Sequence, residues 1–443
     1  MRFDVEWLGA PGVADPLLAA TWARLRIEAG GADVIDLLHL PSNNRRSAVY
    51  GPILPVVEWF VENWWHLLYE PSPASPLLPG RSASRWNFRW VKRHNLLAAR
   101  EGTALPDVVL ARDGADIVVR WFPDGHQEGP RRVRFVGDGV ARVPAPAFEE
   151  AVTALVESTL ARLNEIAPGD ESVQGLAAAW AAILRSDAEE RDLCCSLARL
   201  GVDPYDPSEA NDSLVELVDG INVEFREAAE IRDDLFDGTP PALLADAVEW
   251  VRQNLPSPDV VRAAPVHPTL PPAWAASAHQ TGYQFAHRVR SELMGFSPKD
   301  PIADLQDVLV ERLGWDADPV VIREGNIGLD GLVRLSPGAG KPHLVEPGGR
   351  KLWGERFLLA RSAFFAATAS LGSGRLLTKA VTRHQRTARA FAAELLAPAS
   401  ALMDVVSGVV STDEVLALSE KFGVSSMLIE HQIKNHGLGY VAA

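Results

Sequence analysis

Cysteine is nearly absent from this chain of 443 residues. Its two cysteines are the neighbours Cys194 and Cys195, so the sequence holds no disulfide framework and no Cys-based zinc site. We expect both to be small apolar side chains of a helix that packs in a core. A reducing, cytoplasmic environment fits this composition.

Long apolar runs are also missing. The most apolar stretch, residues 53–68, is shorter than the ~20 residues that span a bilayer. Its polar and apolar side chains fall on opposite stripes, which predicts an amphipathic core helix. The polar stripe contains Glu58, Glu62, Asn63 and His66, and the apolar stripe contains Val57, Phe60, Val61, Trp64 and Leu68. The first residues contain no apolar segment typical of a secretion signal. We therefore expect a cytoplasmic protein with no membrane partner.

Positive charge is in deficit. Lys and Arg number 43 against 58 Asp and Glu, which gives a formal net charge of -15. This balance disfavours broad binding to nucleic acid or anionic membranes. The hydrophobic fraction of 47% and the charged fraction of 23% are typical of a globular protein with sizeable cores. At ~150 residues per domain, the length suggests about three domains, or two of which one is large.

Complete motifs of the common enzyme classes are absent. The segment Ser336–Lys341 resembles a phosphate loop, but Pro342 follows where Ser or Thr would have to reach Mg²⁺. The sequence contains neither His-Glu-x-x-His nor Cys-x-x-Cys. His279 and His287 lie on one predicted helix, where they either share a metal ion or, more commonly, act as ordinary polar residues.

Tryptophan, in contrast, is abundant near the start of the chain, where eight of the 13 precede residue 122. Alternating apolar residues predict two β-hairpins there, over 108–121 with an Asp113-Gly114 turn and over 133–143. With the 53–68 helix and a helix over 148–165, they indicate a Trp-rich α+β domain over residues 1–167. Five of its tryptophans are Trp59, Trp64, Trp65, Trp86 and Trp90. Most of them are expected in the core, and any that are exposed would belong to a partner interface.

The rest of the chain divides into two further parts. Residues 168–272 are predicted to form a helical region that ends in a Pro-rich linker, with a Ser186-x-x-Glu189 capping box at the start of one helix. Residues 273–443 form the third part. We expect its helices over 274–294, 301–314, 354–370 and 378–396, and its strands near 319–323, 329–335 and 343–346. A helix-turn-helix-like element follows, with Gly423 in the turn and a helix capped by Ser425.

Two sequence blocks in this third part are informative. They are Arg389-Ala-Phe-Ala-Ala-Glu-Leu-Leu-Ala-Pro398 and Phe422-Gly-Val-Ser425, and Arg356-Phe-Leu-Leu-Ala360 precedes them. In order and spacing, residues 300–443 resemble the ImmA/IrrE family of zinc metallo-endopeptidases. These are bacterial zincins tied to stress response, mobile-element control and phage defence. The resemblance implies a zincin-like C-terminal domain with a helix-turn-helix-like terminus.

The departures from the family pattern concern its catalytic residues. Where the family reads Arg-Phe-x-x-Ala-His-Glu-x-x-His, Arg361 takes the place of the first zinc histidine and Ser362 that of the general-base glutamate. Phe365 replaces the second histidine, and the third, carboxylate ligand falls at or near Thr387. Zinc requires three N, O or S donors, and the attacking water requires a base. The resemblance therefore implies a degenerate, non-catalytic domain without zinc or another cofactor.

The replaced residues suggest two alternatives for the former cleft. Arg361 and Phe365 share a helix face, and Arg383 and His384 are expected on the stripe of Thr387 in the facing helix. The cleft would then bind an anionic group. In the alternative, Arg361 pairs with a neighbouring acid such as Glu394 and fills the site structurally.

We therefore expect a binding, sensing or scaffolding protein in a bacterial stress, phage-defence or toxin–antitoxin-type system, with a protein partner. The sequence leaves open a homo-oligomer. One rival is a divergent zinc-dependent metallo-endopeptidase that recruits His384, Glu394 and a histidine of the helical arm to cleave a regulator protein. Another is a DNA-binding transcriptional regulator, which the terminal helix disfavours because it offers only Lys434.

Overall fold

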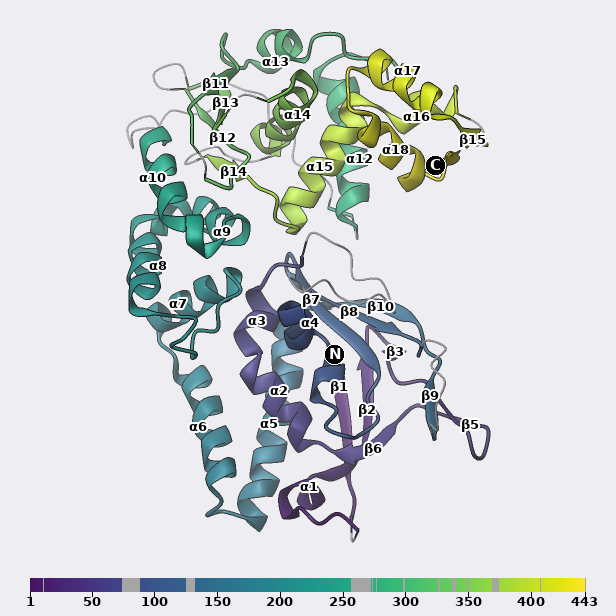
Figure 1. Cartoon of the computed structure of the whole chain (residues 1–443), viewed down its shortest axis with the longest axis vertical. Helices are drawn as coiled ribbons and strands as arrows, with labels where there is room; N and C mark the ends of the chain where they lie inside the picture. The colour runs from purple at the N-terminus through teal and green to yellow at the C-terminus, as the bar shows by residue number, and fades with distance from the viewer. Residues whose placement is uncertain are drawn as a thin grey trace. The chain divides into compact units, whose positions relative to one another are not determined.

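A computed structural model describes residues 1–10, 12–73, 88–124, 132–255, 272, 274–275, 277–297, 299–325, 327–336, 340–348, 350–368, 374–406 and 408–442. The chain forms two compact units, residues 1–218 and 219–443. Each combines helices with small sheets, so the predicted α+β class is confirmed at this level (Figure 1). The three-part division at residues 167 and 272 stays a prediction. Among the described helices, none has both the length and the apolar character to cross a membrane.

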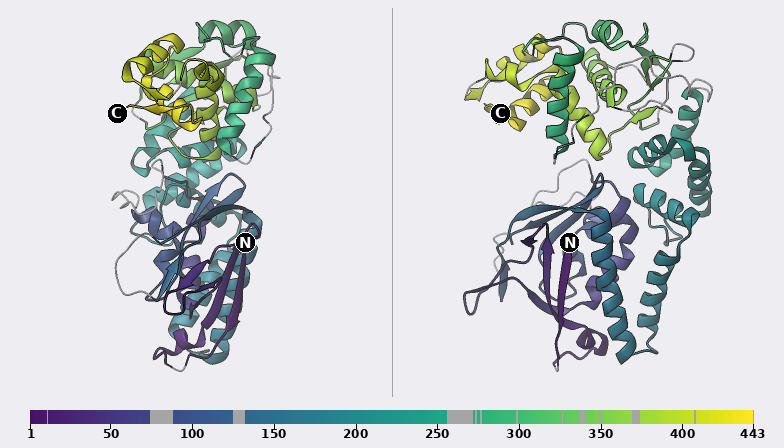
Figure 2. Two further views of the ribbon diagram at one scale, coloured as in Figure 1. Left: turned by 90° about the vertical axis from the view of Figure 1, so that its right-hand side faces the viewer. Right: turned by 180° about the vertical axis from the view of Figure 1, so that it is seen from behind.

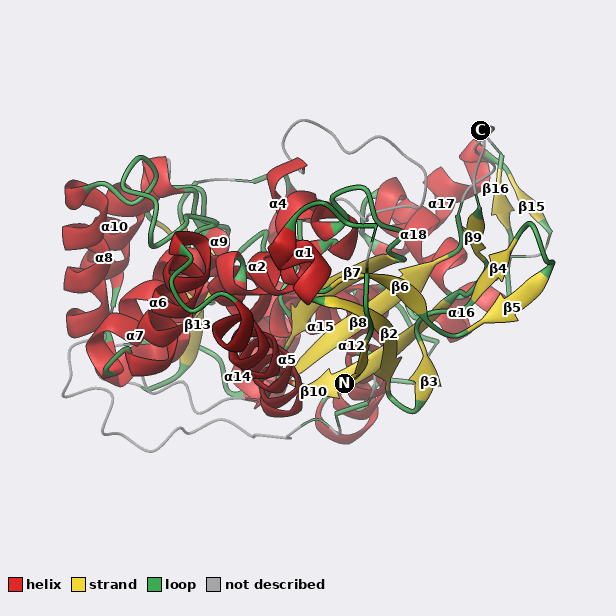
Figure 3. Cartoon of the chain, turned by 90° about the horizontal axis from the view of Figure 1, so that it is seen from below, coloured by secondary structure: helices red, strands yellow, loops and turns green. Residues whose placement is uncertain are grey.

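The first unit contains three small sheets whose paired strands are antiparallel. The first sheet consists of β1 (Arg2–Trp7), β2 (Trp22–Ala29), β3 (Ala32–Asp33) and β6 (Val49–Pro52). The second contains β7 (Asp107–Asp113), β8 (Asp116–Phe122) and β10 (Gly139–Pro144). The third contains β4 (Leu37–His39), β5 (Asn44–Arg46) and β9 (Val133–Phe135). The long helix α5 (Ala145–Ile166) packs against β1, β8 and β10 (Figure 3).

One of the two predicted hairpins is confirmed. β7 and β8 pair directly, with Gly114 at φ +70° in the two-residue loop, one position later than the predicted turn. The second hairpin is wrong, because β9 pairs with β4 while β10 pairs with β8. The backbone amides of Val136 and Gly137 both bind the Asp36 carbonyl, which holds β9 beside β4. Gly139 lies so close to the Trp121 indole that a Cβ there would be 2.2 Å from the ring.

The predicted helix over residues 53–68 is two helices, α2 (Leu54–Glu62) and α3 (Trp64–Tyr69). Asn63 separates them at φ -108°, and its side-chain amide donates to the Trp59 carbonyl. Of the predicted polar stripe, Asn63 and His66 are buried, Glu58 is half-buried and Glu62 is exposed, so only part of the stripe faces solvent. Trp86 lies outside the described residues. The other four tryptophans named above are core residues, as expected: Trp59, Trp64, Trp65 and Trp90.

The predicted helical stretch after residue 170 is confirmed. Its helices are α6 (Glu171–Arg185), α7 (Ala188–Arg199), α8 (Asp212–Glu224), α9 (Ala229–Gly238) and α10 (Leu244–Asn254), and the boundary between the units falls within α8. The cap of α7 is Asp187 rather than Ser186, because the Asp187 carboxylate accepts from the Glu190 amide. Cys194 on α7 is buried, as predicted, and Cys195 is half-buried. Of the Pro-rich linker, residues 256–271 lie outside the described residues.

The second unit is built on a four-stranded sheet of order β11-β13-β12-β14. The strands are β11 (Val320–Ile322), β12 (Gly331–Leu335), β13 (Pro342–Glu346) and β14 (Arg375–Leu377), of which the sequence did not predict β14. Besides α9 and α10, its described helices are α12 (Ala278–Arg288), α13 (Leu305–Leu313), α14 (Leu352–Thr368), α15 (Arg383–Leu396), α16 (Ala399–Met403), α17 (Thr412–Phe422) and α18 (Ser426–Asn435). A small pair, β15 (Val409–Val410) and β16 (Tyr440–Val441), completes the unit.

Helix α15 lies at the centre of this unit, where it packs against both α12 and α14 (Figure 2). α12 approaches α15 so closely that a Cβ on Gly282 would lie 2.7 Å from the Thr387 carbonyl and the Phe391 amide. The rings of Phe285, Phe364 and Phe391 join the three helices into one core, with centroids 5.5–5.8 Å apart.

The α17–turn–α18 element forms as predicted. Gly423 adopts φ +60° between the two helices, a left-handed conformation that glycine accommodates without strain. The Ser425 hydroxyl accepts from the Leu428 amide and caps α18.

Candidate functional site

Helix α14 carries the residues that the resemblance places at the zinc motif. Ten consecutive residues, Leu358–Ala367, are buried, so this part of the helix meets other protein on every side. A buried polar group must find its hydrogen-bond partners inside the protein. The surroundings of Arg361 therefore decide whether the former cleft is open or closed.

Three acceptors surround the Nη1 and Nη2 atoms of Arg361, whereas its Nε has no partner among the described residues. Its Nη1 donates to Asp330 Oδ2 at 2.9 Å, and its Nη2 donates to the Thr378 carbonyl at 2.7 Å and to Gln385 Oε1 at 2.9 Å. Burial lowers the pKa of the Arg361 guanidinium, and the Asp330 carboxylate opposes this effect. The structural alternative predicted from sequence is thus the arrangement present, but the acid is Asp330. Glu394 lies nine residues beyond Gln385 on α15, about 14 Å along the helix axis.

A second buried ion pair lies beside the first. Arg375 on β14 donates to both oxygens of Asp234, at 2.9 and 3.2 Å. Burial opposes its charge, but the Asp234 carboxylate raises the pKa of Arg375 overall. The Arg375 guanidinium also lies over the ring of Phe365, 4.7 Å from its centroid. The position that the resemblance aligns with the second zinc histidine is therefore covered by a cation.

Gln385 connects the two ion pairs. Its Oε1 accepts from Arg361, while its Nε2 donates to Asp234 Oδ1 at 3.3 Å and to the Leu376 carbonyl at 2.7 Å. We call the set formed by Asp234, Asp330, Arg361, Arg375 and Gln385 the double-arginine network. It holds two guanidinium groups and two carboxylates, so its formal charges balance.

The hydroxyl residues of the predicted site do not join this network. The Ser362 hydroxyl donates to the Leu358 carbonyl at 3.0 Å, and the Thr387 hydroxyl donates to the Arg383 carbonyl at 2.8 Å, each within its own helix. Thr387 lies on the side of α15 that contacts α12. At 100° per residue, Gln385 is about 200° away from it, and Gln385 is the residue that faces Arg361. The expectation that Thr387 faces α14 is therefore wrong.

Arg383 and His384 also lie away from Arg361. Arg383 donates to the Ala275 carbonyl and lies 5.7 Å from the ring centroid of Trp274, which His384 contacts edge-on at 5.3 Å. The expected group of cations around Arg361 does not form with these two residues. Arg389 is present instead, donating to the carbonyls of Thr378 and Ala380. Burial and, to a lesser extent, the nearby Arg361 lower the pKa of Arg389 to about 10.

Glu394 is fully buried in a separate cluster that joins α12, α15 and the end of α18. Its oxygens accept from the Ala399 amide at 3.0 Å and from Gln432 Nε2 at 2.8 Å. The Nε2 atoms of His287 and His436 lie 3.2 and 3.3 Å from its two oxygens. Burial alone would raise the pKa of Glu394, but these partners lower it to about 2.

The zinc ion that the resemblance implies does not fit the residues at these positions. Arg361 and Phe365 offer no donor atom for a cation, and Ser362 donates its hydroxyl to its own helix. The ligand set of the rival metallopeptidase is not brought together either, because His384 lies ten residues before Glu394, about 15 Å along α15. Across the described residues, no three His, Cys, Asp or Glu side chains gather in a group that could hold a metal ion.

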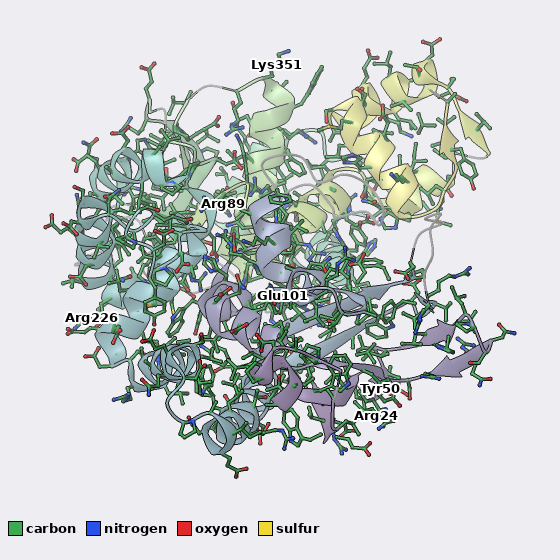
Figure 4. The ribbon with its side chains drawn as sticks, turned by 60° about the horizontal axis from the view of Figure 1, so that its bottom comes forward. Arg24, Tyr50, Arg89, Glu101, Arg226 and Lys351 are labelled. Atoms are coloured by element: carbon green, nitrogen blue, oxygen red, sulfur yellow. The ribbon has the colours of Figure 1, made fainter. Side chains whose placement is uncertain are left out.

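A cavity of about 590 Å³ lies next to the double-arginine network. Its walls come from α12, the start of α14, α15 and α18, and Arg389 reaches both the cavity and the Thr378 carbonyl to which Arg361 donates. Lys351, another lining residue, precedes the first turn of α14 (Figure 4).

Sequence reasoning missed the residues that close the site. Asp234, Asp330 and Arg375 lie outside the two helices compared with the family, and Gln385 lies two residues before Thr387, the position that the family pattern indicates. Comparisons of the chain with protein-family models, with curated proteins and with solved structures find no match.

Proposed function

We propose that the chain is a non-catalytic binding protein whose C-terminal part is a degenerate ImmA/IrrE-like, zincin-like domain. The double-arginine network supports this proposal. Arg361 at the first ligand position and Arg375 over Phe365 at the second place two cations where a peptidase would need donor atoms for zinc. The carboxylates of Asp330 and Asp234 are committed to those cations, so neither is free to act as a general base.

The proposed role is sensing or scaffolding in a bacterial stress, phage-defence or toxin–antitoxin-type system, in the cytoplasm and with a protein partner. In this proposal the Trp-rich α+β domain and the helical middle region precede the degenerate domain, and the α17–turn–α18 element is its helix-turn-helix-like terminus. Helix α18 buries Leu428, Ile429, Gln432 and Ile433 and carries Lys434 as its lysine or arginine, which favours a packing role over reading DNA.

The experiment combines metal analysis with a partner test. The full chain, purified from cells grown with added zinc, is expected to retain far less than one equivalent of zinc after dialysis. It is then co-expressed with the products of the neighbouring genes, and the complexes are separated by size-exclusion chromatography and weighed by intact mass spectrometry.

The expected result is co-elution with one of these proteins, with both chains intact. One equivalent of tightly held zinc, or cleavage of the partner that EDTA prevents, would overturn the non-catalytic assignment. Failure of every neighbouring product to co-elute would overturn the proposed type of system.

A further inference from the structure

The cavity beside the double-arginine network has the size and walls of a small-molecule site. Its volume of about 590 Å³ lies within the ~300–1,000 Å³ typical of ligand pockets, which are mostly apolar with a few polar groups. The apolar wall consists of three aromatic side chains and two aliphatic ones: Tyr283, Trp353, Phe357, Met427 and Leu428. Trp353 and Met427 are 51% and 62% exposed, so apolar surface continues to the rim.

The charged groups around this cavity are of one sign. Lys351 and Arg389 line it together with His279 and His431, and no Asp or Glu is among its described lining residues. This is unusual in a chain of net charge -15. A cation that faces an apolar wall without a carboxylate beside it favours an anionic ligand, because the ligand then supplies the missing counter-charge.

Within the described part of the chain, neither of the two permanent cations forms an ion pair, although the Asp330 carboxylate acts on Arg389 from a distance. Lys351 is exposed and makes no ion pair there. Arg389 donates only to the neutral carbonyls of Thr378 and Ala380. The nearby carboxylate of Glu394 is buried and already occupied by Gln432 and the Ala399 amide.

Two helix starts add to this positive potential. Lys351, Trp353 and Gly354 flank or form the first turn of α14, which also contains Glu355, and Ser425, Met427 and Leu428 flank or form the first turn of α18. The N-terminal end of a helix carries a partial positive charge, so both helices favour an anion at this cavity.

We propose that this cavity binds a small amphipathic anion, with an aromatic or aliphatic body against Trp353 and Phe357 and an acidic head group near Lys351 and Arg389. The proposal concerns a small-molecule ligand. It goes beyond the function proposed above and does not depend on it, since neither zinc content nor a protein partner enters the argument.

The test uses two fluorescent probes with the same aromatic body. The first, 8-anilinonaphthalene-1-sulfonate, carries an anionic group, and the second, N-phenyl-1-naphthylamine, lacks it. Each is titrated into the full chain and into the variants Lys351→Ala and Trp353→Ala. The matched controls are Lys379→Ala, which removes an equally exposed lysine elsewhere in the same unit, and Leu352→Ala, which removes an exposed apolar side chain that does not line the cavity.

Saturable binding of the sulfonate at one site per chain is expected. K351A should weaken the sulfonate by about three- to ten-fold and leave the neutral probe unchanged, because only the sulfonate uses the charge. W353A should weaken both probes by a similar factor, while K379A and L352A should change neither. Added salt should weaken the sulfonate more than the neutral probe.

Two results would overturn the proposal. Sulfonate binding that neither K351A nor W353A changes would place the probe elsewhere on the chain. Equal weakening of both probes by K351A would show that the lysine charge plays no part, and the ligand would then have no reason to be an anion. All four substitutions lie at exposed positions, and thermal unfolding of each variant checks that the unit remains folded.

Discussion

The ion pair between Asp330 and Arg361 should be the most sensitive point of the C-terminal unit. The two side chains are 8% and 5% exposed, and the atoms that pair are 2.9 Å apart. Removing one partner of a buried ion pair costs about 3–5 kcal/mol, because the other charge remains buried without compensation. We therefore examine Asp330→Ala and Arg361→Met, which remove the same contact from opposite sides.

The two variants should differ in severity. Asp330→Ala leaves the Arg361 guanidinium with only neutral acceptors, the Thr378 carbonyl and Gln385 Oε1, so we expect a loss of about 4 kcal/mol. Arg361→Met leaves Asp330 beside a second cation, Arg350, whose Nη2 is 3.1 Å away. We expect about 2 kcal/mol for this change, since the remaining carboxylate keeps an ionic partner. The double variant should cost less than the sum of the two.

Hydrogen–deuterium exchange of peptides from α14 and α15 measures this loss within the unit itself. Since every 1.4 kcal/mol is a factor of ten, about 4 kcal/mol corresponds to exchange faster by almost a thousand-fold in Asp330→Ala. Lys379→Met, an exposed lysine of the same unit, is the control and should leave exchange unchanged. If Arg361→Met exchanged as slowly as the wild type, or more slowly, Arg361 would be an open, unpaired cation and the closed network would be refuted.

Two further predictions concern α15 and its neighbours. Gly282→Ala places a Cβ 2.7 Å from the Thr387 carbonyl and should destabilise the unit by about 1–3 kcal/mol in urea unfolding. Gly220→Ala, at a helical glycine with open space around it, should stabilise the chain by about 0.5–1 kcal/mol. If both variants changed the unfolding free energy in the same direction, the close contact between Gly282 and Thr387 would be contradicted. Because the pKa of Glu394 is lowered from 4.5 to about 2, its charge stabilises the fold above pH 4.5, and this contribution is lost as the pH falls towards 2. Urea midpoints of wild type and Glu394→Gln should therefore converge between pH 4.5 and 2, and a constant difference would show that the carboxylate is not held charged by its partners.

The features that sequence alone predicted well depend on local chemistry. Ser425 caps α18 through its own hydroxyl, and Gly423 supplies the positive φ of the turn before it. The β7–β8 hairpin follows from alternating apolar residues around a glycine turn. Pairing across long distances was not predictable in this way. The short strand β9 finds its partner β4 almost a hundred residues earlier, and nothing in its own sequence specifies that choice.

The same distinction applies to the candidate site. Helical spacing indicated that Arg361 and Phe365 share a face, but it could not identify what meets that face. Asp330 lies 31 residues before Arg361, just ahead of β12, and Asp234 lies far earlier, on α9. On α15, a shift of two residues from Thr387 to Gln385 reverses the side of the helix, so an approximate alignment selected the wrong neighbour.

The double-arginine network also explains why histidine substitutions on α14 alone should not create a zinc site. With histidine in place of Arg361 and Phe365, the guanidinium of Arg375 would still lie over position 365. Asp234 holds Arg375 there and also accepts from the Gln385 amide. Removing the Arg375 cation would therefore leave the buried Asp234 carboxylate without an ionic partner. Two cations and two carboxylates stabilise one another across α9, β14, α14 and the segment before β12, and Gln385 of α15 connects them. Building a metal site at these positions would therefore require coordinated substitutions on several elements rather than on α14 only.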